Sequence, residues 1–312
     1  MTLRAPPRAW THRHLLDVDT LSRDEIDRVL DLADEMREAR ETRAHRSLLD
    51  LETVALAFYE PSTRTRVSFE LAAKALGATV VDLAVERSSA GKGESLVDTL
   101  RTLRRVGATI VVLRHPSSGA PYLAARETDL SIVNGGDGTH AHPTQALLDA
   151  LTLREALGSL DGRLLAIVGD VAHSRVARSN IHALTKLGAR VRVGGPSAWV
   201  VGFEDWPGVE VATTLPAALE GADAVMTLRV QSERGAVAGV GSLADYVRDW
   251  RLDEERLASA APGAPILHPG PTNEGVELTA ALANGPRSRI GRQVEHGVTV
   301  RMAVLALVAG VA

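Results

Sequence analysis

Short apolar runs alternate with helical patterns along most of this chain, and this alternation limits the fold more than any other feature. The runs lie near residues 53–59, 78–83, 108–113, 130–134, 163–168, 189–193, 208–212, 223–228 and 264–267. Strands that alternate with helices indicate a parallel sheet wound by right-handed crossovers. We therefore predict an α/β fold with about four strands in the first half of the chain and five in the second.

The length of the chain suits two such sheets. Its 312 residues are enough for two hydrophobic cores, since single domains commonly hold about 150 residues. Aromatic side chains are scarce, so we expect cores built from Ala, Val, Leu and Ile. A capping box at Ser22–Glu25 opens one helix, and clear helical patterns lie at 94–106, 143–157 and 175–188. We predict two doubly wound parallel-sheet domains that face each other across a cleft and are bridged by long helices, including the one at 143–157.

The composition excludes several classes of function. The chain has no cysteine, which rules out disulfides, cysteine-ligated zinc and thiol nucleophiles. Its net charge of −4 gives no electrostatic reason to expect nucleic acid or an anionic membrane as a partner. Residues 1–19 lack the apolar stretch of a signal peptide, and residues 298–312 are too short and too charged to span a bilayer. We expect a soluble cytoplasmic protein.

The most informative polar motif is Ser62-Thr63-Arg64-Thr65-Arg66, which follows the first apolar run. It opens a helical pattern in which Val67, Leu71 and Ala75 are four residues apart. Backbone N–H groups, the helix dipole and arginine forks at such a helix start form a receptor for oxyanions. The alternative is an N-cap serine followed by a solvated basic turn. Two Ser/Thr-Arg pairs in tandem at a strand-to-helix junction favour a phosphate or carboxylate site.

Polar motifs also follow six other predicted strands. They occupy residues 88–94, 114–116, 137–145, 170–178, 229–234 and 268–271. Ligands of open α/β sheets bind beyond the carboxyl ends of the strands, so we expect these motifs to form one composite site. The candidate side chains are Arg64, Lys92, Arg114, His142, Arg175 and Arg229, with Thr63, Thr65 and Gln145 as neutral donors. A cationic site in a mildly acidic protein suits small, multiply anionic substrates.

Other motif readings fit less well. The segment Gly91-Lys92-Gly93 lacks both the upstream glycine and the hydroxyl of a P-loop. The turn at 168–172 has a single glycine, which argues against a dinucleotide site. The pair His140 and His142 has no third strong ligand nearby, so no metal is expected. The sequence also lacks the G-x-S-x-G elbow of serine hydrolases.

Together these motifs resemble the aspartate carbamoyltransferase family, catalytic chain, over residues 15–309. Residues 62–66 are similar to the signature that all carbamoyltransferases share. The run His142-Pro143-Thr144-Gln145 resembles the aspartate branch, whereas the ornithine branch usually has Cys at the position of Thr144 and another run at 268–271. Segments 91–94, 173–179 and 229–231 also match the aspartate type.

The resemblance implies an enzyme that transfers the carbamoyl group of carbamoyl phosphate to the amine of L-aspartate. The products would be N-carbamoyl-L-aspartate and phosphate, an early step of de novo pyrimidine biosynthesis. It implies a carbamoyl phosphate-binding domain at 1–143, with a C-terminal helix at 291–312 packing back on it, and an aspartate-binding domain at 144–290. No cofactor or metal is implied. Two alternatives stay open: an ornithine or other carbamoyltransferase, and a non-catalytic carbamoyl phosphate-binding scaffold.

The resemblance also assigns residues to the carbamoyl phosphate site. These are Ser62, Thr63, Arg64, Thr65, Arg114, His142, Gln145, Gly270 and Pro271. The first four would hold the phosphate, the next three would contact the carbamoyl end, and the last two would offer backbone carbonyls. The implied catalytic residues are Arg64, Thr65, Lys92, Arg114 and His142.

A second set would bind L-aspartate, and part of it would come from another subunit. The implied aspartate ligands are Lys92, Arg175, Arg229 and Gln231. Lys92, together with Ser88, would lie on a loop that reaches into the site of the neighbouring subunit. The resemblance therefore implies a homotrimer with shared active sites. A regulatory chain or a dihydroorotase partner would be a separate polypeptide.

Overall fold

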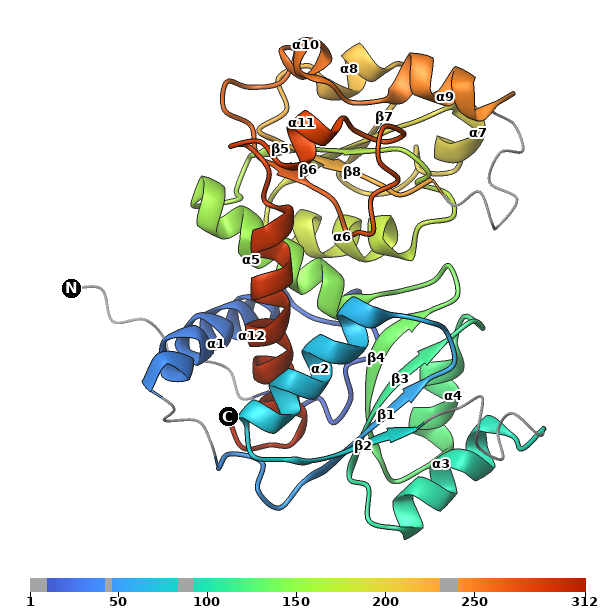
Figure 1. Cartoon of the computed structure of the whole chain (residues 1–312), viewed down its shortest axis with the longest axis vertical. Helices are drawn as coiled ribbons and strands as arrows, with labels where there is room; N and C mark the ends of the chain where they lie inside the picture. Colours follow the sequence, from blue (N-terminus) through green and yellow to red (C-terminus); the bar gives the residue numbers. More distant parts are fainter. Residues whose placement is uncertain (1–9, 43–46, 84–92, 231–240) are drawn as a thin grey trace. The chain divides into compact units, whose positions relative to one another are not determined.

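The structure is a computed structural model that describes residues 10–42, 47–83, 93–230 and 241–312. The chain divides into two compact units (Figure 1). Unit 1 comprises Met1–Leu148 together with Glu295–Ala312, and unit 2 comprises Asp149–Val294. Two helices carry the chain between the units, because α5 (Pro143–Leu157) begins in unit 1 and α12 (Ile290–Val308) returns to it.

Unit 1 is built on a four-stranded sheet with the order β2-β1-β3-β4. The strands are β1 (Thr53–Phe58), β2 (Thr79–Leu83), β3 (Ile110–His115) and β4 (Ser131–Asp137). The helices that lie wholly in this unit are α1 (Arg23–Thr42), α2 (Thr63–Ala75), α3 (Leu96–Arg105) and α4 (Ala120–Glu127). All three strand pairings are parallel, as the alternation of apolar runs and helical patterns predicted.

The sheet of unit 1 is covered on both faces. Alternate residues of its central strands pack with Leu100 and Leu103 of α3 and with Ala124 of α4. On the other side of the sheet lie α2 and the end of α12 (Figure 1). There the guanidinium of Arg301 stacks over the ring of Phe69, 5.0 Å from its centre. Burial on both faces explains why the central strands β1 and β3 read as continuous apolar runs in the sequence.

Unit 2 is built on a five-stranded sheet with the order β7-β6-β5-β8-β9. The strands are β5 (Leu164–Val168), β6 (Arg190–Gly194), β7 (Val209–Ala212), β8 (Ala224–Thr227) and β9 (Ile266–Leu267). The helices that lie wholly in this unit are α6 (Arg175–Lys186), α7 (Ser197–Val200), α8 (Leu215–Leu219), α9 (Leu243–Trp250), α10 (Glu254–Leu257) and α11 (Ala280–Ala283). Its pairings are also parallel, so the predicted pair of parallel-sheet domains is confirmed.

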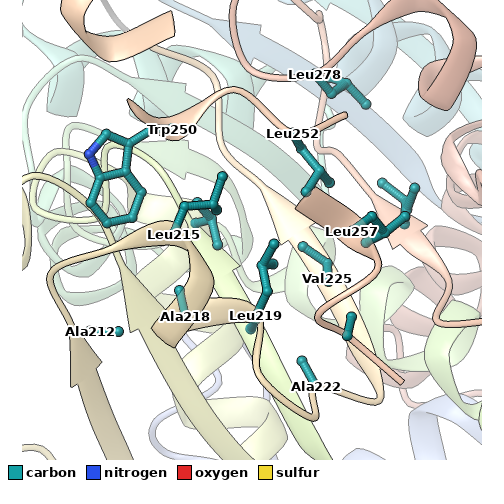
Figure 2. Close-up of a cluster of buried hydrophobic side chains, with 14 of the residues drawn as sticks. Ala212, Leu215, Ala218, Leu219, Ala222, Val225, Trp250, Leu252, Leu257 and Leu278 are labelled. Carbon is teal, nitrogen blue, oxygen red and sulfur yellow. The ribbon is translucent and has the colours of Figure 1, made fainter. Parts of the chain in front are cut away.

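The core of unit 2 lies between its sheet and the helices α8, α9 and α10 (Figure 2). Leu215, Ala218 and Leu219 of α8 meet Val225 of β8 in this cluster. Most of its members are Ala, Val and Leu, as the composition predicted. Aromatic rings also contribute, because Trp199, Tyr246 and Trp250 are buried in the same cluster.

The first long helix shows how local sequence sets a boundary. Helix α1 begins at Arg23, directly after Ser22, the first residue of the predicted capping box. The backbone N–H of Ser22 donates to the carboxylate of Glu25 at 2.7 Å, and the N–H of Glu25 donates to the Ser22 hydroxyl at 3.3 Å. These reciprocal bonds satisfy donors that a helix start otherwise leaves unpaired. No helix in the described part of the chain has both the length and the apolar character needed to cross a bilayer.

Each sheet has one point where its strand order reverses direction. In unit 1 the chain moves outward from β1 to β2 and then crosses back to β3 on the other side of β1. In unit 2 it moves from β5 to β6 and β7 and then crosses back to β8. The loops after the two strands at such a switch point diverge, and the crevice between them is the usual ligand site of open α/β sheets. The segments after β1 and β3, and after β5 and β8, are therefore where ligands are expected.

Candidate active site

The switch point of unit 1 carries the Ser62–Arg66 motif at the start of α2. Ser62 is the N-cap residue and has an extended backbone (φ −163°), but its side chain makes no capping hydrogen bond. Helix α2 then begins at Thr63, so the N–H groups of its first turn lie at the end of β1. The dipole of this 13-residue helix adds positive potential at the same place. The local geometry is that of an anion receptor. The Ser62 hydroxyl does not cap the helix, so it can donate to an anion.

The two arginines of the motif have different partners. Arg66 donates to Asp82 of β2 at 2.7 Å and lies 3.9 Å from Glu70. The side chain of Arg64 is exposed and forms no ion pair or hydrogen bond with other described residues. Arg66 is therefore used in a surface ion pair, while the charge of Arg64 remains available to an anion at the switch point.

Arg114 lies on the opposite side of the same switch point, at the end of β3. Its Nη1 donates to the carbonyl of Gly135 at 3.1 Å, and its Nε lies 3.6 Å from a carboxylate oxygen of Glu60. Its own carbonyl accepts the N–H of Tyr59 at 2.8 Å, which ties the end of β3 to the end of β1. The half-buried guanidinium is thus fixed beside the turn that leads to Ser62.

His142 and Gln145 enter the same region from the start of α5. Both side chains are buried, and the carbonyl of His142 accepts the N–H of Gln145 at 3.0 Å. The loop that leads to them is fastened by Asp137, the last residue of β4, which is fully buried. The Asp137 carboxylate accepts N–H groups of Gly119 at 2.7 Å and Ala141 at 3.2 Å. Asp137 therefore holds the loop in place, a role that its position in a glycine-rich run did not reveal.

Next to Arg114, His115 is a neutral structural residue. Burial lowers the pKa of His115, with the charge of Glu60 opposing the shift. Its Nδ1 accepts the N–H of Ser117 at 3.0 Å, a bond that requires the unprotonated nitrogen. The positive charge at this strand end therefore comes from Arg114 rather than from His115.

The switch point of unit 2 carries Arg175 and Arg229. Arg175 is the first residue of α6, and the N-cap hydroxyl of Ser174 accepts the N–H of Ala177 at 3.1 Å. Arg229 follows β8, and the N–H of Leu228 donates to the Val168 carbonyl at 2.8 Å. This bond extends the pairing of β8 with β5 by one residue. The two arginines thus stand at the ends of the two strands between which the sheet order reverses.

Asp170 fixes the turn between β5 and α6. Its carboxylate is fully buried, accepts the N–H of His173 at 3.3 Å and lies 2.7 Å from Nδ1 of the same residue. The turn that ends at Arg175 is therefore pinned from inside the unit. The sequence showed that the segment 170–178 is polar. It did not show that Asp170 anchors the turn, whereas Arg175 is the candidate for binding.

Gly270 and Pro271 follow β9, the neighbour of β8 in the same sheet. The Nδ1 atom of His268 accepts the N–H of Gly270 at 2.8 Å, and the N–H of His268 donates to the side chain of Gln293 at 3.0 Å. His268 is fully buried, so the start of this loop is held rigidly. Three adjacent strand ends of unit 2 therefore carry the predicted residues of that unit.

The structure thus gathers the predicted site residues into two groups, one in each unit. The group in unit 1 consists of Ser62, Thr63, Arg64, Thr65, Arg114, His142 and Gln145. The group in unit 2 consists of Arg175, Arg229, Gly270 and Pro271. Ser88, Lys92 and Gln231 lie outside the described residues. The predicted cleft between the domains stays a prediction.

The chemistry of the two groups differs. A helix start with hydroxyls and two arginines, as in unit 1, suits a phosphate group with several oxygens. Two arginines at one switch point, as in unit 2, suit a molecule with two carboxylates, because a guanidinium can form a forked pair with a carboxylate. The two groups therefore differ in the kind of anion that they suit.

Comparison with known proteins agrees with this division. Residues 13–155 match the family described as aspartate/ornithine carbamoyltransferase, carbamoyl-P binding domain. Residues 161–308 match aspartate/ornithine carbamoyltransferase, Asp/Orn binding domain. The aspartate carbamoyltransferase catalytic subunit of Beijerinckia indica subsp. indica is 51% identical over 298 residues, which cover 95% of this chain and 94% of that protein.

Solved structures show the same relationship. The aspartate transcarbamoylase from Trypanosoma cruzi in complex with carbamoyl phosphate and aspartate is 31% identical, with a TM-score of 0.86 over 96% of this chain and 98% of that chain. The ornithine carbamoyltransferase from Thermus thermophilus is 29% identical, with a TM-score of 0.84 over 96% of this chain and 99% of that chain. With both halves matched and relatives at this level of identity, the chain belongs to the aspartate/ornithine carbamoyltransferase family.

Proposed function

We propose that this protein transfers the carbamoyl group of carbamoyl phosphate to L-aspartate, giving N-carbamoyl-L-aspartate and phosphate in an early step of de novo pyrimidine biosynthesis. The observation that carries the proposal is the chemistry at the two switch points. In unit 1 the start of α2 with Arg64 suits a phosphate and Arg114 lies at the end of the neighbouring strand β3, whereas in unit 2 Arg175 and Arg229 suit two carboxylates. Curated relatives at about half identity are named aspartate carbamoyltransferase catalytic subunits.

Unit 1 binds carbamoyl phosphate in this proposal. The phosphate is held by the first turn of α2 and by residues 62–65, and the carbamoyl end contacts Arg114, His142 and Gln145. Burial of His142 and Gln145 excludes water from that end, which favours transfer to an amine over hydrolysis. The region corresponds to the predicted domain at 1–143 with the C-terminal helix at 291–312.

Unit 2 binds L-aspartate, in the region of the predicted domain at 144–290. Arg175 and Arg229 each hold one carboxylate, and Lys92 and Gln231 complete the binding. Gly270 and Pro271 offer backbone carbonyls to the carbamoyl amide and the incoming amine. Two arginines that must each meet a carboxylate also select against ornithine, whose side chain ends in an ammonium group that they would repel.

The reaction proceeds by attack of the aspartate amine on the carbamoyl carbon. A C–N bond forms, a tetrahedral intermediate carries negative charge on the former carbonyl oxygen, and the bond from carbon to the phosphate oxygen breaks. Thr65, Arg114 and His142 stabilise that oxyanion, and one such donor contributes roughly 3–4 kcal/mol to transition-state binding. The departing phosphate takes the proton of the amine, so no protein base is required. Holding two mutually repelling anions in attack geometry supplies a further part of the rate enhancement.

The active unit is a homotrimer with shared sites in this proposal. Three apolar side chains on the edge of unit 1 support it, because Val67 and Leu71 of α2 and Val81 of β2 are 37%, 50% and 40% exposed. β2 is the edge strand of its sheet and leads directly into the segment with Ser88 and Lys92. An apolar edge next to that segment suits contact with a second copy. A regulatory chain or a dihydroorotase partner would be a separate polypeptide. The absence of cysteine suits a cytoplasmic location.

One assay tests the function. Purified protein is incubated with carbamoyl phosphate and either L-aspartate or L-ornithine, and carbamoyl aspartate and citrulline are measured. Formation of carbamoyl aspartate alone is expected. Citrulline as the main product would favour an ornithine carbamoyltransferase. Binding of carbamoyl phosphate without either product would favour a non-catalytic scaffold.

A further inference from the structure

Glu277 is a fully buried acid that belongs to none of the sequence motifs. It lies in unit 2 between β9 and α11, and its carbonyl accepts the N–H of Leu252 at 2.9 Å. Its carboxylate accepts three hydrogen bonds: from the backbone of Val230 at 2.9 Å, from the backbone of Asn273 at 2.8 Å and from the Asn273 side chain at 2.8 Å. The ring Nε2 of His268 lies 3.9 Å from it. Burial raises the pKa of Glu277, and the hydrogen bonds from Val230 and Asn273 oppose that shift because they favour the ionised carboxylate. These buried hydrogen bonds restrain the positions of all the groups that take part in them.

These bonds fix the backbone on one side of Arg229. On the other side, the N–H of Leu228 is already paired with β5. The carbonyl of Val230 accepts the side-chain amide of Asn273 at 3.1 Å, so both polar groups of the Val230 backbone are held. Leu228 and Val230 are buried, and Arg229 between them is only partly so. Because both buried neighbours of Arg229 are anchored, the backbone that carries its side chain is fixed on both sides.

The same carboxylate also holds the loop that follows β9. Asn273 lies two residues beyond Pro271, and both its backbone and its side chain donate to Glu277. The segment with Arg229 and the loop with Gly270 and Pro271 therefore share one buried anchor. Three N–H groups donate to the side chain at this position. An ionised carboxylate suits them because both of its oxygens accept hydrogen bonds and neither donates.

We propose that Glu277 is a positioning residue that holds Arg229 in the orientation needed to bind a carboxylate of the amino-acid substrate. The inference rests on the proposed function, since it assumes that Arg229 binds L-aspartate. Glu277 itself is enclosed and contacts no substrate. Its effect is transmitted through the backbone of Val230 and through Asn273.

Glu277→Gln tests the proposal, with Glu210→Gln as the matched control. Glutamine is as large as glutamate, but one of its two terminal groups is an NH₂ group. That group cannot accept the hydrogen bonds of the N–H donors around position 277. Glu210 belongs to the same unit and pairs with Arg190 and Arg192 at the surface, so its replacement makes the same chemical change away from the site. We expect the KM for L-aspartate to rise about tenfold or more in Glu277→Gln, as the loss of a charge-assisted bond implies. The dissociation constant of carbamoyl phosphate, measured by calorimetry, should change far less, because most of its ligands lie in unit 1 and only Gly270 and Pro271 belong to the anchored loop. Glu210→Gln should match the parent in both values.

Asn273→Ala provides a second variant, because it removes only the side-chain donor to Glu277 and Val230. Asn273→Ala should also raise the KM for L-aspartate. Thermal melting shows whether the variant is folded. An unchanged KM for L-aspartate in a folded Glu277→Gln protein would overturn the proposal. So would a loss of carbamoyl phosphate binding as large as the loss of L-aspartate binding, or failure of both variants to fold, because Glu277 would then serve stability alone. An inactive parent would instead refute the proposed function.

Discussion

Gln293 of α12 donates its side-chain amide to the carboxylate of Asp149 of α5 at 2.7 Å, across 144 residues of sequence. The second oxygen of Asp149 accepts the side-chain amide of Asn180 from α6 at 2.8 Å. All three side chains are buried. One carboxylate therefore joins α5, α12 and α6 at residues that all belong to unit 2, and α6 begins at Arg175.

Asp149→Ala should destabilise the protein strongly. It leaves two buried amide donors without their acceptor, which costs roughly 3 kcal/mol of the free energy of unfolding. Glu155→Ala is the control, because Glu155 also joins α5 to α12 but through an exposed pair with Arg292 at 2.6 Å. That change should cost at most about 1 kcal/mol. Urea titration of both variants measures the difference, and equal losses would contradict the assigned role of Asp149.

Arg64→Ala should abolish most activity without affecting stability. The guanidinium of Arg64 has no ion-pair partner among the described residues, so its removal disturbs no folded contact. Losing one charged donor to the phosphate should lower kcat/KM by about 100-fold. Steady-state kinetics and thermal melting of the same preparation measure the two effects.

Arg66→Ala is the matched control for that change. It breaks the exposed pair with Asp82 and should cost at most about 1 kcal/mol of stability. Its loss of activity should be much smaller than that of Arg64→Ala. A larger loss in Arg66→Ala would show that the roles of the two arginines are reversed.

Arg175→Lys should weaken aspartate binding selectively. Lysine keeps the charge but loses the planar fork that pairs with a carboxylate, so the KM for L-aspartate should rise roughly tenfold. Binding of carbamoyl phosphate should stay unchanged, because its ligands lie mainly in unit 1. Arg190→Lys, at the surface pair with Glu210, serves as the control and should leave both values unchanged. An equal effect on both substrates would contradict the assignment of Arg175 to aspartate.

The fold could be predicted from the sequence because its signals are local. Each strand lies at a short apolar run that the sequence marks, and the central strands β1, β3, β5 and β8 are mostly or fully buried. The predicted helix patterns became α3, α5 and α6 with ends shifted by two residues at most. The polar motifs could be assigned to the ends of strands, because each of them directly follows a predicted strand in the sequence. The carboxylates that hold the site could not be found. Asp149 meets its partners across 31 and 144 residues, and Glu277 meets Val230 across 47, so no local pattern marks them.

Asp17→Asn should stabilise the protein at neutral pH. Burial of Asp17 in unit 1 raises its pKa to about 6, with Asp19 and Asp137 adding to the shift, while the Val18 N–H and His140 oppose it. The folded state therefore binds this proton more tightly than the unfolded chain, in which the pKa is near 3.8. The contribution of Asp17 to the free energy of unfolding falls as the pH rises from 3.8 to about 6, and it stays low above that.

An asparagine at position 17 still accepts the Val18 N–H, which Asp17 accepts at 2.7 Å, but it carries no charge. At pH 7.5 the variant should gain about 1–3 kcal/mol, and its stability should depend less on pH between 4 and 6 than that of the parent. Thermal melting across this range measures both. Asp50→Asn, at an exposed position of the same unit, should change neither the stability at pH 7.5 nor its dependence on pH. A loss of stability at pH 7.5 would show that the attraction between Asp17 and His140 outweighs the cost of burial.

Two inactive variants should restore activity when their subunits are mixed. If the sites are shared, Lys92 of one subunit completes the site that contains His142 of its neighbour. Lys92→Ala and His142→Ala proteins should each be nearly inactive. In randomly exchanged trimers about a quarter of the sites combine an intact Lys92 with an intact His142, so about a quarter of the parent activity should return. Mass spectrometry of the mixture verifies the exchange, and hybrid trimers without activity would show that each site is built from one chain.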